Sequence, residues 1–281
     1  MKTNNKTISN PIKKNNKFEK LGFSVLYLSV IAYMILAFFA LTSCSSDDDN
    51  NSESNTVAIP DTNFEQALID LDIDTNGLNG NILKTDALAV PSLDIRNKNI
   101  DDLQGIEAFV NLRYLLCDSN NLTSLDVSAN IKLWRLYASN NQLTQITFQN
   151  NTELYEIAVT NNQFTSLDVS NVIALKNLNC FSNAIEALDL SNNDALISLS
   201  CSSNMLTSLD VSNNNALTSL SCDSNALTSL NVKNGNNANF NNFNATSNFN
   251  LFCVQVDDVA FSNANWSNGI DGFSVFSEDC N

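Results

Sequence analysis

The sequence contains no histidine, and its 14 basic residues are outnumbered by 30 acidic ones. Without histidine, general base catalysis would depend on carboxylates or lysine, and no serine, cysteine or acid pair stands apart from the repeat described below. No glycine-rich loop of the phosphate-binding kind is present. The net charge of −16 disfavours nucleic acid as a partner. These absences argue against an enzyme and predict no cofactor.

The basic residues are concentrated at the start of the chain, where six lie within the first twenty positions and precede an apolar run over residues 21–40. A run of about 20 apolar residues can span a bilayer, so an uncleaved signal anchor is one interpretation. The run ends in the tetrapeptide LTSC, residues 41–44, which resembles the lipobox of bacterial lipoproteins. That resemblance implies a signal peptide over residues 1–43 and an acylated Cys44 that anchors the protein to a membrane.

A polar, acidic segment, SSDDDNNSESNT, follows Cys44. It cannot bury apolar surface, so we expect a flexible linker over residues 44–56. A run of serine and aspartate directly after the lipidated cysteine also resembles the surface-export signal of lipoproteins in the Bacteroidetes, although an ordinary solvated linker has the same composition. Both interpretations place the folded part outside the cytoplasm, at the outer membrane or the cell surface.

A 21-residue repeat occupies the middle of the chain. A leading leucine recurs at positions 112, 133, 154, 175, 196 and 217, a second leucine or isoleucine follows three residues later, and an asparagine follows eight residues later. Five residues after each leading leucine stands a small apolar residue: Cys117, Ala138, Val159, Cys180, Cys201 or Cys222. A similar second half, such as LTSLDVSAN at 122–130, completes each unit. Both halves alternate apolar and polar residues, which predicts two short strands per unit and no helix.

A single unit cannot bury its own apolar edge, but stacked units can, with parallel strands between successive coils. The pattern LxxLxCxxN resembles the leucine-rich repeat, specifically its short nested bacterial form, over residues 90 to 232. The resemblance implies a β-rich solenoid of about six to seven coils with parallel sheets. Its leucines would fill the interior, and its asparagines would satisfy backbone groups at the turns.

Both flanks of the array depart from its period. Residues 57–110 contain an expected amphipathic helix over about Asn63 to Leu71 and an irregular first repeat with Lys98 at the asparagine position. The regular array spans 111–232, and 233–281 forms a C-terminal cap. The segments IPDTNFEQALIDL and VQVDDVAFSNANW resemble the caps of secreted leucine-rich repeat proteins from flavobacteria. Caps are also expected because exposed array ends promote aggregation.

The seven cysteines separate by position. Four lie in the inward strand column, where other coils have alanine or valine, and are expected to be small buried hydrophobes. Metal binding or disulfides between coils are the alternatives, but there is no CxxC motif and stacked side chains point in parallel. Cys253 and Cys280 lie off the period in a cap expected to be exported, which favours a disulfide between them.

Two acidic features could bind calcium. Aspartates share one outward column of the second half-repeats: Asp126, Asp168, Asp189 and Asp210. Neighbouring carboxylates could bind calcium or act as an acid and base pair, but a solvated acidic ladder is the simpler interpretation. The segment DIDTNG at 72–77 begins like a calcium loop, yet its twelfth position is Leu83 instead of a bidentate acid. We therefore predict no metal site.

The outward positions of the first half-repeats differ along the array. If Leu115 and Cys117 point inward, their neighbours point outward. These neighbours are aromatic or charged in the first four coils and mostly serine, threonine or isoleucine in the last two. Exposed aromatic residues with arginine are frequent binding anchors, and the resemblance implies that this sheet is the binding face. The predicted ligand-binding residues are Arg113, Tyr114, Leu116, Trp134, Arg135, Tyr137, Tyr155, Glu156, Lys176 and Phe181.

The sequence thus predicts a surface-anchored leucine-rich repeat protein that recognises a macromolecule, a protein or a glycan, through this sheet and performs no catalysis. Two alternatives remain open at this stage. One is a structural spacer or stalk without a specific ligand. The other is a calcium-dependent module, or an accessory module of a glycan hydrolase, that uses the acidic columns.

Overall fold

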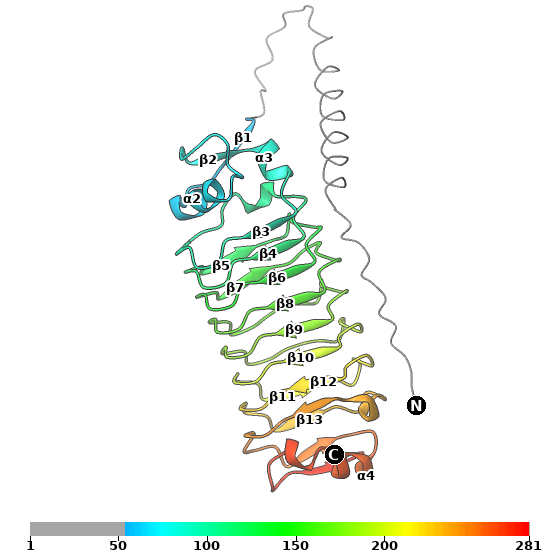
Figure 1. Cartoon of the computed structure of the whole chain (residues 1–281). Coiled ribbons are helices and arrows are strands. Elements are labelled where there is room, and N and C mark those ends of the chain that lie inside the picture. The colour runs from blue at the N-terminus through cyan, green and yellow to red at the C-terminus, as the bar shows by residue number, and fades with distance from the viewer. Residues whose placement is uncertain (1–53, 281) are drawn as a thin grey trace, which may run out of the picture. The chain divides into compact units, whose positions relative to one another are not determined.

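The computed structural model describes residues 54–280, and these form a β-solenoid whose coils stack in chain order (Figure 1). The first half of each coil contributes one strand to a parallel 8-stranded sheet, here called sheet 1. Its strands, in chain order, are β3 (Ser92–Asp94), β4 (Tyr114–Leu116), β6 (Arg135–Tyr137), β8 (Glu156–Ala158), β9 (Asn177–Asn179), β10 (Ser198–Ser200), β12 (Ser219–Ser221) and β14 (Asn242–Asn244). The predicted solenoid with parallel strands is confirmed, but the eight strands of sheet 1 exceed the predicted six to seven coils.

The second halves of the coils form the opposite side, here called sheet 2. One group pairs β5 (Ser124–Asp126) with β7 (Gln145–Thr147). Between the groups, Ser166 and Ala187 form an isolated parallel bridge. The second group is four-stranded, in the order β11 (Ser208–Asp210), β13 (Ser229–Asn231), β15 (Cys253–Gln255) and β16 (Val275–Ser277).

The repeated leucines fill the space between the sheets. In sheet 1 the central residue of every strand is buried, and successive central residues pair across the sheet, as Leu115 does with Leu136 and Leu136 with Ile157. From Leu115 to Leu220 each coil adds 21 residues, so apolar side chains stack on equivalent ones. Burial of this continuous apolar column is the main stabilising contribution.

Asparagine side chains close the turns that follow sheet 1. Asn141 Nδ2 donates to the carbonyl oxygens of Ala138, in its own coil, and Cys117, in the preceding coil, at 3.2 and 3.0 Å. Its Oδ1 accepts from the backbone N–H of Leu122 at 3.1 Å. The same arrangement recurs at Asn204. Each asparagine thus satisfies backbone groups that would otherwise be buried without partners.

The N-terminal end is covered by a small mixed cap. It consists of β1 (Thr56–Ala58) antiparallel to β2 (Asn81–Leu83), the helices α2 (Thr62–Asp70) and α3 (Lys84–Leu88), and the 3-10 turn η1 (Ile106–Ala108). The predicted helix is confirmed as α2, and Asp61 caps it by accepting from the N–H groups of Asn63 and Phe64. Lys98, which replaces the turn asparagine, directs its side chain to Asp70 of α2 at 3.2 Å.

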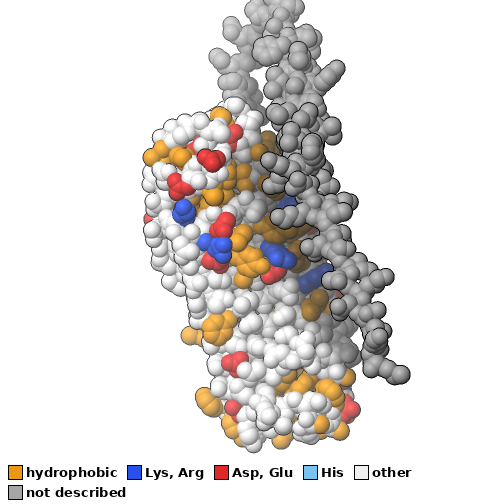
Figure 2. All heavy atoms as spheres, in the orientation of Figure 1, with side chains coloured by type: hydrophobic (Ala, Val, Ile, Leu, Met, Phe, Trp, Pro, Cys, Tyr) orange, Lys and Arg blue, Asp and Glu red, His pale blue; other side chains and the backbone are white. Residues whose placement is uncertain are grey.

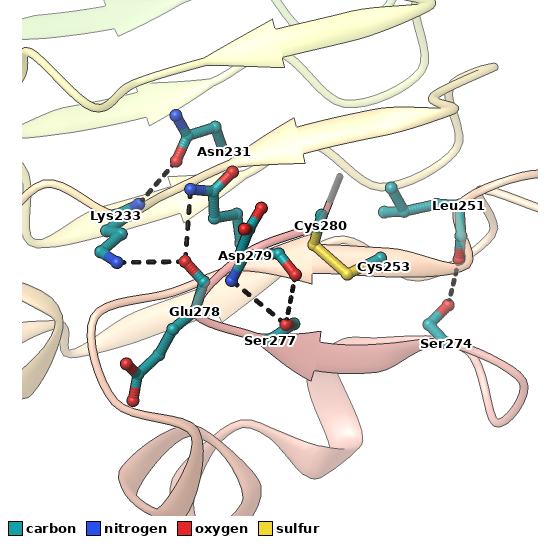
Figure 3. Close-up of a disulfide and its surroundings, with 10 residues drawn as sticks. Asn231, Lys233, Leu251, Cys253, Ser274, Ser277, Glu278, Asp279 and Cys280 are labelled. Atoms are coloured by element: carbon teal, nitrogen blue, oxygen red, sulfur yellow. Dashed lines mark hydrogen bonds between the residues drawn. A yellow bond between two sulfur atoms is a disulfide. The ribbon is translucent and has the colours of Figure 1, made fainter.

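The C-terminal end combines added strands with a short helix. The turn η2 (Asn237–Asn239) precedes β14, and α4 (Val259–Asn265) with η3 (Ser267–Gly269) lies between β15 and β16. The predicted disulfide between Cys253 and Cys280 is confirmed, with the Cα atoms 5.8 Å apart (Figure 3). It ties the last residues of the chain to β15, and Lys233 Nζ donates to the Glu278 carbonyl oxygen nearby at 3.0 Å.

The predicted signal peptide over residues 1–43, the predicted lipid site Cys44 and most of the predicted linker lie outside the described residues. Within residues 54–280, no helix has both the length and the apolar character needed to cross a membrane.

Candidate functional site

Three strands of sheet 1, β4, β6 and β8, carry the predicted binding residues. The central residue of each strand is buried, and the residues on either side of it point to the outer face, where they are half-buried. The residue before each strand lies on the same face, and this column reads Arg113, Trp134, Tyr155 and Lys176 in successive coils. Because the strands are in register, side chains from adjacent coils meet in rows across the sheet.

The first contact cluster joins the coils of β4 and β6. The guanidinium of Arg113 lies over the Trp134 ring, 4.5 Å from its centroid. Tyr114 meets the same indole edge to face, with centroids 5.9 Å apart and an interplanar angle of 87°. Cation–π and edge-to-face contacts of this kind orient large side chains at little conformational cost. The cluster holds Trp134 between a cation and a second ring.

The second cluster is centred on Arg135 and joins β6 to β8. Arg135 Nε donates to the Tyr155 hydroxyl at 2.7 Å and lies 3.1 Å from Glu156 Oε2. The Tyr137 hydroxyl donates to the other oxygen of Glu156 at 2.6 Å. The guanidinium also lies 5.3 Å from the Tyr155 ring centroid and 5.9 Å from that of Tyr114, which links the two clusters. Seven side chains from three coils therefore form one connected network.

The network changes the protonation behaviour of two of its members. The hydrogen bond to Tyr155 and the charge of Glu156 raise the pKa of Arg135 above its ordinary value. Partial burial, together with the hydrogen bond to Glu156, raises the pKa of the Tyr137 hydroxyl. Both shifts make the proton harder to remove from the donor.

The remaining predicted residues are less closely connected. Leu116 lies beside Tyr137 in the register of β4 and β6. Lys176 is exposed, and among the described residues its ammonium group has neither a hydrogen bond nor an ion pair. Phe181 follows the end of β9 by two residues and is 39% exposed. It therefore lies beyond the strand positions that carry the network.

Sequence reasoning missed three residues beside this surface: Asn111, Lys132 and Glu153. Glu153 accepts a hydrogen bond from Trp134 Nε1 at 2.8 Å, and Lys132 Nζ donates to Asn111 Oδ1 at 2.7 Å. All three partners stand one position before a leading leucine. In the later coils this column contains Ala174, Ala195 and Ala216, so comparing it along the array would have revealed them.

A hollow of about 560 Å³ adjoins this surface at the N-terminal end of sheet 1. It is bounded by the outward residues Ser92 and Asp94 of β3, by apolar residues including Ile73 and Val90, and by the carboxylates of Asp72 and Asp86. Since Ser92 pairs with Tyr114 across β3 and β4, the hollow and the aromatic surface share one face. Its acidic rim favours a basic group.

The strands β10 and β12, in the C-terminal half of the same face, carry small polar side chains. The outward residues of β10 and β12 are Ser198, Ser200, Ser219 and Ser221. Figure 2 shows hydrophobic and charged side chains gathered over the N-terminal coils, a mostly uncharged polar surface over the middle coils, and hydrophobic side chains again near the C-terminal end. The predicted binding residues are thus concentrated on one part of the solenoid.

Comparison with known proteins supports the fold by structure alone, since no family model and no curated protein matches the chain. The functional domain of InlJ from Listeria monocytogenes is 27% identical, with a TM-score of 0.50, over 73% of this chain and 58% of that one. An internalin (inlF) from the same organism is 22% identical over 78% of this chain and 71% of its own, with a TM-score of 0.58. An internalin C2 is 19% identical over 81% of this chain and all of its own, with a TM-score of 0.56.

The fold is a leucine-rich repeat solenoid. This chain spans less than two thirds of the InlJ domain, so the likeness concerns the repeat array. The InlJ domain includes a cysteine ladder. In this leucine-rich repeat solenoid Cys180, Cys201 and Cys222 also stack in consecutive coils, and with Cys117 they are buried free thiols, as the column predicted. Burial raises the pKa of Cys180 to about 12, which makes the thiol unreactive at neutral pH.

The acidic column of sheet 2 closes turns of the leucine-rich repeat. Asp126 and Asp168 each accept a hydrogen bond at 2.9 Å from the backbone N–H two residues later, and Asp189 and Asp210 do the same. Hydrogen bonds from Ser170 hold the pKa of Asp168 below its ordinary value. The column thus has a structural role beyond a solvated ladder.

The turn that follows the calcium-like segment at 72–77 is organised around the carboxylate of Glu65. Glu65 Oε1 accepts from the backbone N–H groups of Asn79, Gly80 and Asn81 at 2.6 to 3.1 Å. Asp74 is 6% exposed, and burial raises its pKa. Across residues 54–280, no three acidic or cysteine side chains are grouped so that they could hold a metal ion.

Proposed function

We propose that this chain is a protein-binding leucine-rich repeat protein. Its binding surface consists of the outward side chains of β4, β6 and β8 together with the adjoining acidic hollow. The observation that carries the proposal is the connected network of Arg113, Tyr114, Trp134, Arg135, Tyr137, Tyr155 and Glu156, which covers only these coils. The leucine-rich repeat fold itself does not require it, because the later coils fold with serine at the same positions.

The network favours a protein over a glycan as the ligand of this surface. Its charged groups already bind one another, so they offer few free donors or acceptors to sugar hydroxyls. Its aromatic rings remain half-buried, held in place, and available for apolar contact. Large, ordered aromatic and arginine side chains are the residues that most often dominate protein interfaces.

The acidic hollow adds a second element of recognition. Asp72 and Asp86 stand at its rim, beside the apolar residues Ile73 and Val90. A lysine or arginine of the partner would place its apolar stem against the walls and its charge near the carboxylates. The partner therefore presents a basic side chain next to an apolar patch.

The location of the protein is a further part of the proposal. The LTSC tetrapeptide and the acidic linker support a lipid anchor at Cys44 and display at the outer membrane or cell surface. Metabolic labelling with an alkyne-bearing fatty acid should modify the protein and leave Cys44→Ser unlabelled. Protease added to intact cells should then distinguish display on the surface from a periplasmic orientation.

The binding surface is tested by a matched pair of triple variants. Trp134→Ser, Arg135→Ser and Tyr137→Ser together remove the centre of the network, whereas Thr218→Ala, Ser219→Ala and Ser221→Ala change equivalent positions in a plain coil. A partner captured by crosslinking, identified by mass spectrometry and purified should bind the first variant about 100-fold more weakly than the unmodified protein, and the second variant equally well.

If the network variant binds as well as the control, the surface is not the binding site. If no partner is captured, the solenoid is better explained as a structural spacer. Calcium-dependent melting would instead favour a calcium-dependent module.

A further inference from the structure

A second hollow lies at the C-terminal end of sheet 1, at the opposite end of the array from the acidic one. Its volume is about 650 Å³, and it is bounded by the outward residues Asn242 and Asn244 of β14 and by residues of α4 and η3. Its lining contains no charged side chain. This hollow differs from the N-terminal one, whose rim carries the carboxylates of Asp72 and Asp86.

Side-chain amides supply hydrogen-bonding groups on several sides of this hollow. Asn241 and Asn268 are exposed, and among the described residues their amides have no hydrogen-bond partner. Asn265 Nδ2 donates to the Phe261 carbonyl oxygen at 2.8 Å, which leaves its Oδ1 available. Asn244 Oδ1 accepts from Thr246, which leaves its Nδ2 available. The hollow therefore presents donors and acceptors together, without charge.

Aromatic rings form the other part of its lining. Trp266 stacks on Phe243 with centroids 4.5 Å apart and an interplanar angle of 18°, and it is only 5% exposed. Phe261 meets the indole edge to face at 5.8 Å, and Phe240 packs against it at 5.2 Å. Phe240 and Phe261 stay half-buried at the hollow. These rings are fixed by mutual contact and offer apolar surface beside the amides.

A neutral sugar matches this combination. Its hydroxyls both donate and accept hydrogen bonds, and its C–H faces pack on aromatic rings. An anionic ligand would be repelled by the net charge of the chain, and a cationic one would find no carboxylate in the lining. We propose that the C-terminal hollow binds a neutral oligosaccharide, independently of the protein-binding surface on β4, β6 and β8.

The test uses the full chain and isothermal titration calorimetry with cellohexaose, laminarihexaose, xylohexaose and mannohexaose at up to about 10 mM. At least one of these neutral hexasaccharides should bind the unmodified protein, and hexagalacturonate should not. The variant Asn241→Asp with Asn268→Asp keeps the shape of both side chains, removes both amide donor groups and adds two negative charges. It should bind at least about tenfold more weakly, as should Phe261→Ala.

The matched control is Asn171→Asp with Asn192→Asp, which makes the same change at exposed asparagines away from the hollow. This control and the Trp134, Arg135 and Tyr137 triple variant should bind sugar normally. The proposal is overturned if none of the four neutral sugars binds, if the Asn241 and Asn268 variant binds normally, or if the control loses binding equally. Melting temperatures of all variants distinguish loss of the site from loss of the fold.

Discussion

The coils of β4, β6 and β8 have the same kinds of buried residue and turn as the coils of β10 and β12. The two groups differ in their outward side chains. In both groups a central leucine or isoleucine is buried, the next inward residue is small, and the turn asparagine makes the same bonds. Only the outward columns differ, with Trp134, Arg135 and Tyr137 in one group where the other has Thr218, Ser219 and Ser221. In this protein the residues that determine the fold and those that form the candidate site occupy separate columns.

The largest predicted effect tests whether the turn asparagines contribute equally to stability in the two groups of coils. Asn141→Ala and Asn204→Ala each leave a buried backbone N–H without its partner and remove one of the amide hydrogen bonds accepted by each of two carbonyl oxygens. We expect each to lower the free energy of unfolding by about 3 kcal/mol, by equal amounts within about 0.5 kcal/mol. Urea titration followed by circular dichroism measures both. A much larger loss in one group would show that the coils are not equivalent.

The next prediction uses the four buried thiols, of which Cys117 follows β4 and the other three follow β9, β10 and β12. Burial raises the pKa of Cys180 from 9.0 to about 12, and raises those of Cys201 and Cys222 as well. The unfolded chain therefore loses these protons first, so stability is unaffected below about pH 9 and falls above it. The fall should approach about 1.4 kcal/mol per pH unit for each thiol.

Alanine variants separate this effect from other titrations. Alanine already occupies the column at position 138, so Cys180→Ala, Cys201→Ala and Cys222→Ala together should still fold. Between pH 9 and 11 the stability of this variant should fall less steeply than that of the unmodified protein. Cys117→Ala should reduce the slope by only about one third as much. Identical slopes for all three proteins would contradict the prediction, and urea titration at each pH measures them.

The smallest effect concerns the network itself. Glu156→Gln removes the charge that Arg135 and Tyr137 share, but the carboxylate and guanidinium are partly exposed, so unfolding free energy should change by less than about 1 kcal/mol. The pKa of Tyr137 should fall toward its ordinary value, which ultraviolet titration of tyrosinate detects. Ser198→Ala in the plain coils is the control and should change neither quantity. An unchanged tyrosine titration would show that Glu156 does not act on Tyr137.

Most of the array was predictable because inward positions tolerate little variation. The spacing of Leu112 and its equivalents was sufficient to place the strands, and the disulfide followed from two cysteines outside the period. The continuation of sheet 1 into β14 was not predicted, because the loop around Gly235 adds two residues before Asn248. Asn248 nevertheless bonds to the carbonyl oxygens of Cys222 and Ala245, as its equivalents do. Surface loops absorb insertions without moving the residues that point inward.

The candidate site was predictable as a set of positions, but its contacts were not. Spacing identified Tyr114, Trp134 and Arg135 as outward residues. It could not show that Arg135 would bind Tyr155 and Glu156 instead of facing solvent, because that depends on side-chain rotamers across two coils. Glu153 was missed because it lies outside the strand pattern that guided the search.

The turn asparagines also make each turn depend on the coil that follows it. Each reaches back to a carbonyl oxygen 24 residues earlier in the regular coils, as Asn162 does to Ala138 and Asn183 to Val159. During synthesis a coil therefore leaves the ribosome before the asparagine of the next coil has been added. The hydrogen bonds between that asparagine and the turn can form only afterwards. A chain interrupted at any coil would present one incomplete turn at its growing end. Within residues 54–280, Asn248 makes the last of these contacts, because its amide donates to the Cys222 carbonyl oxygen.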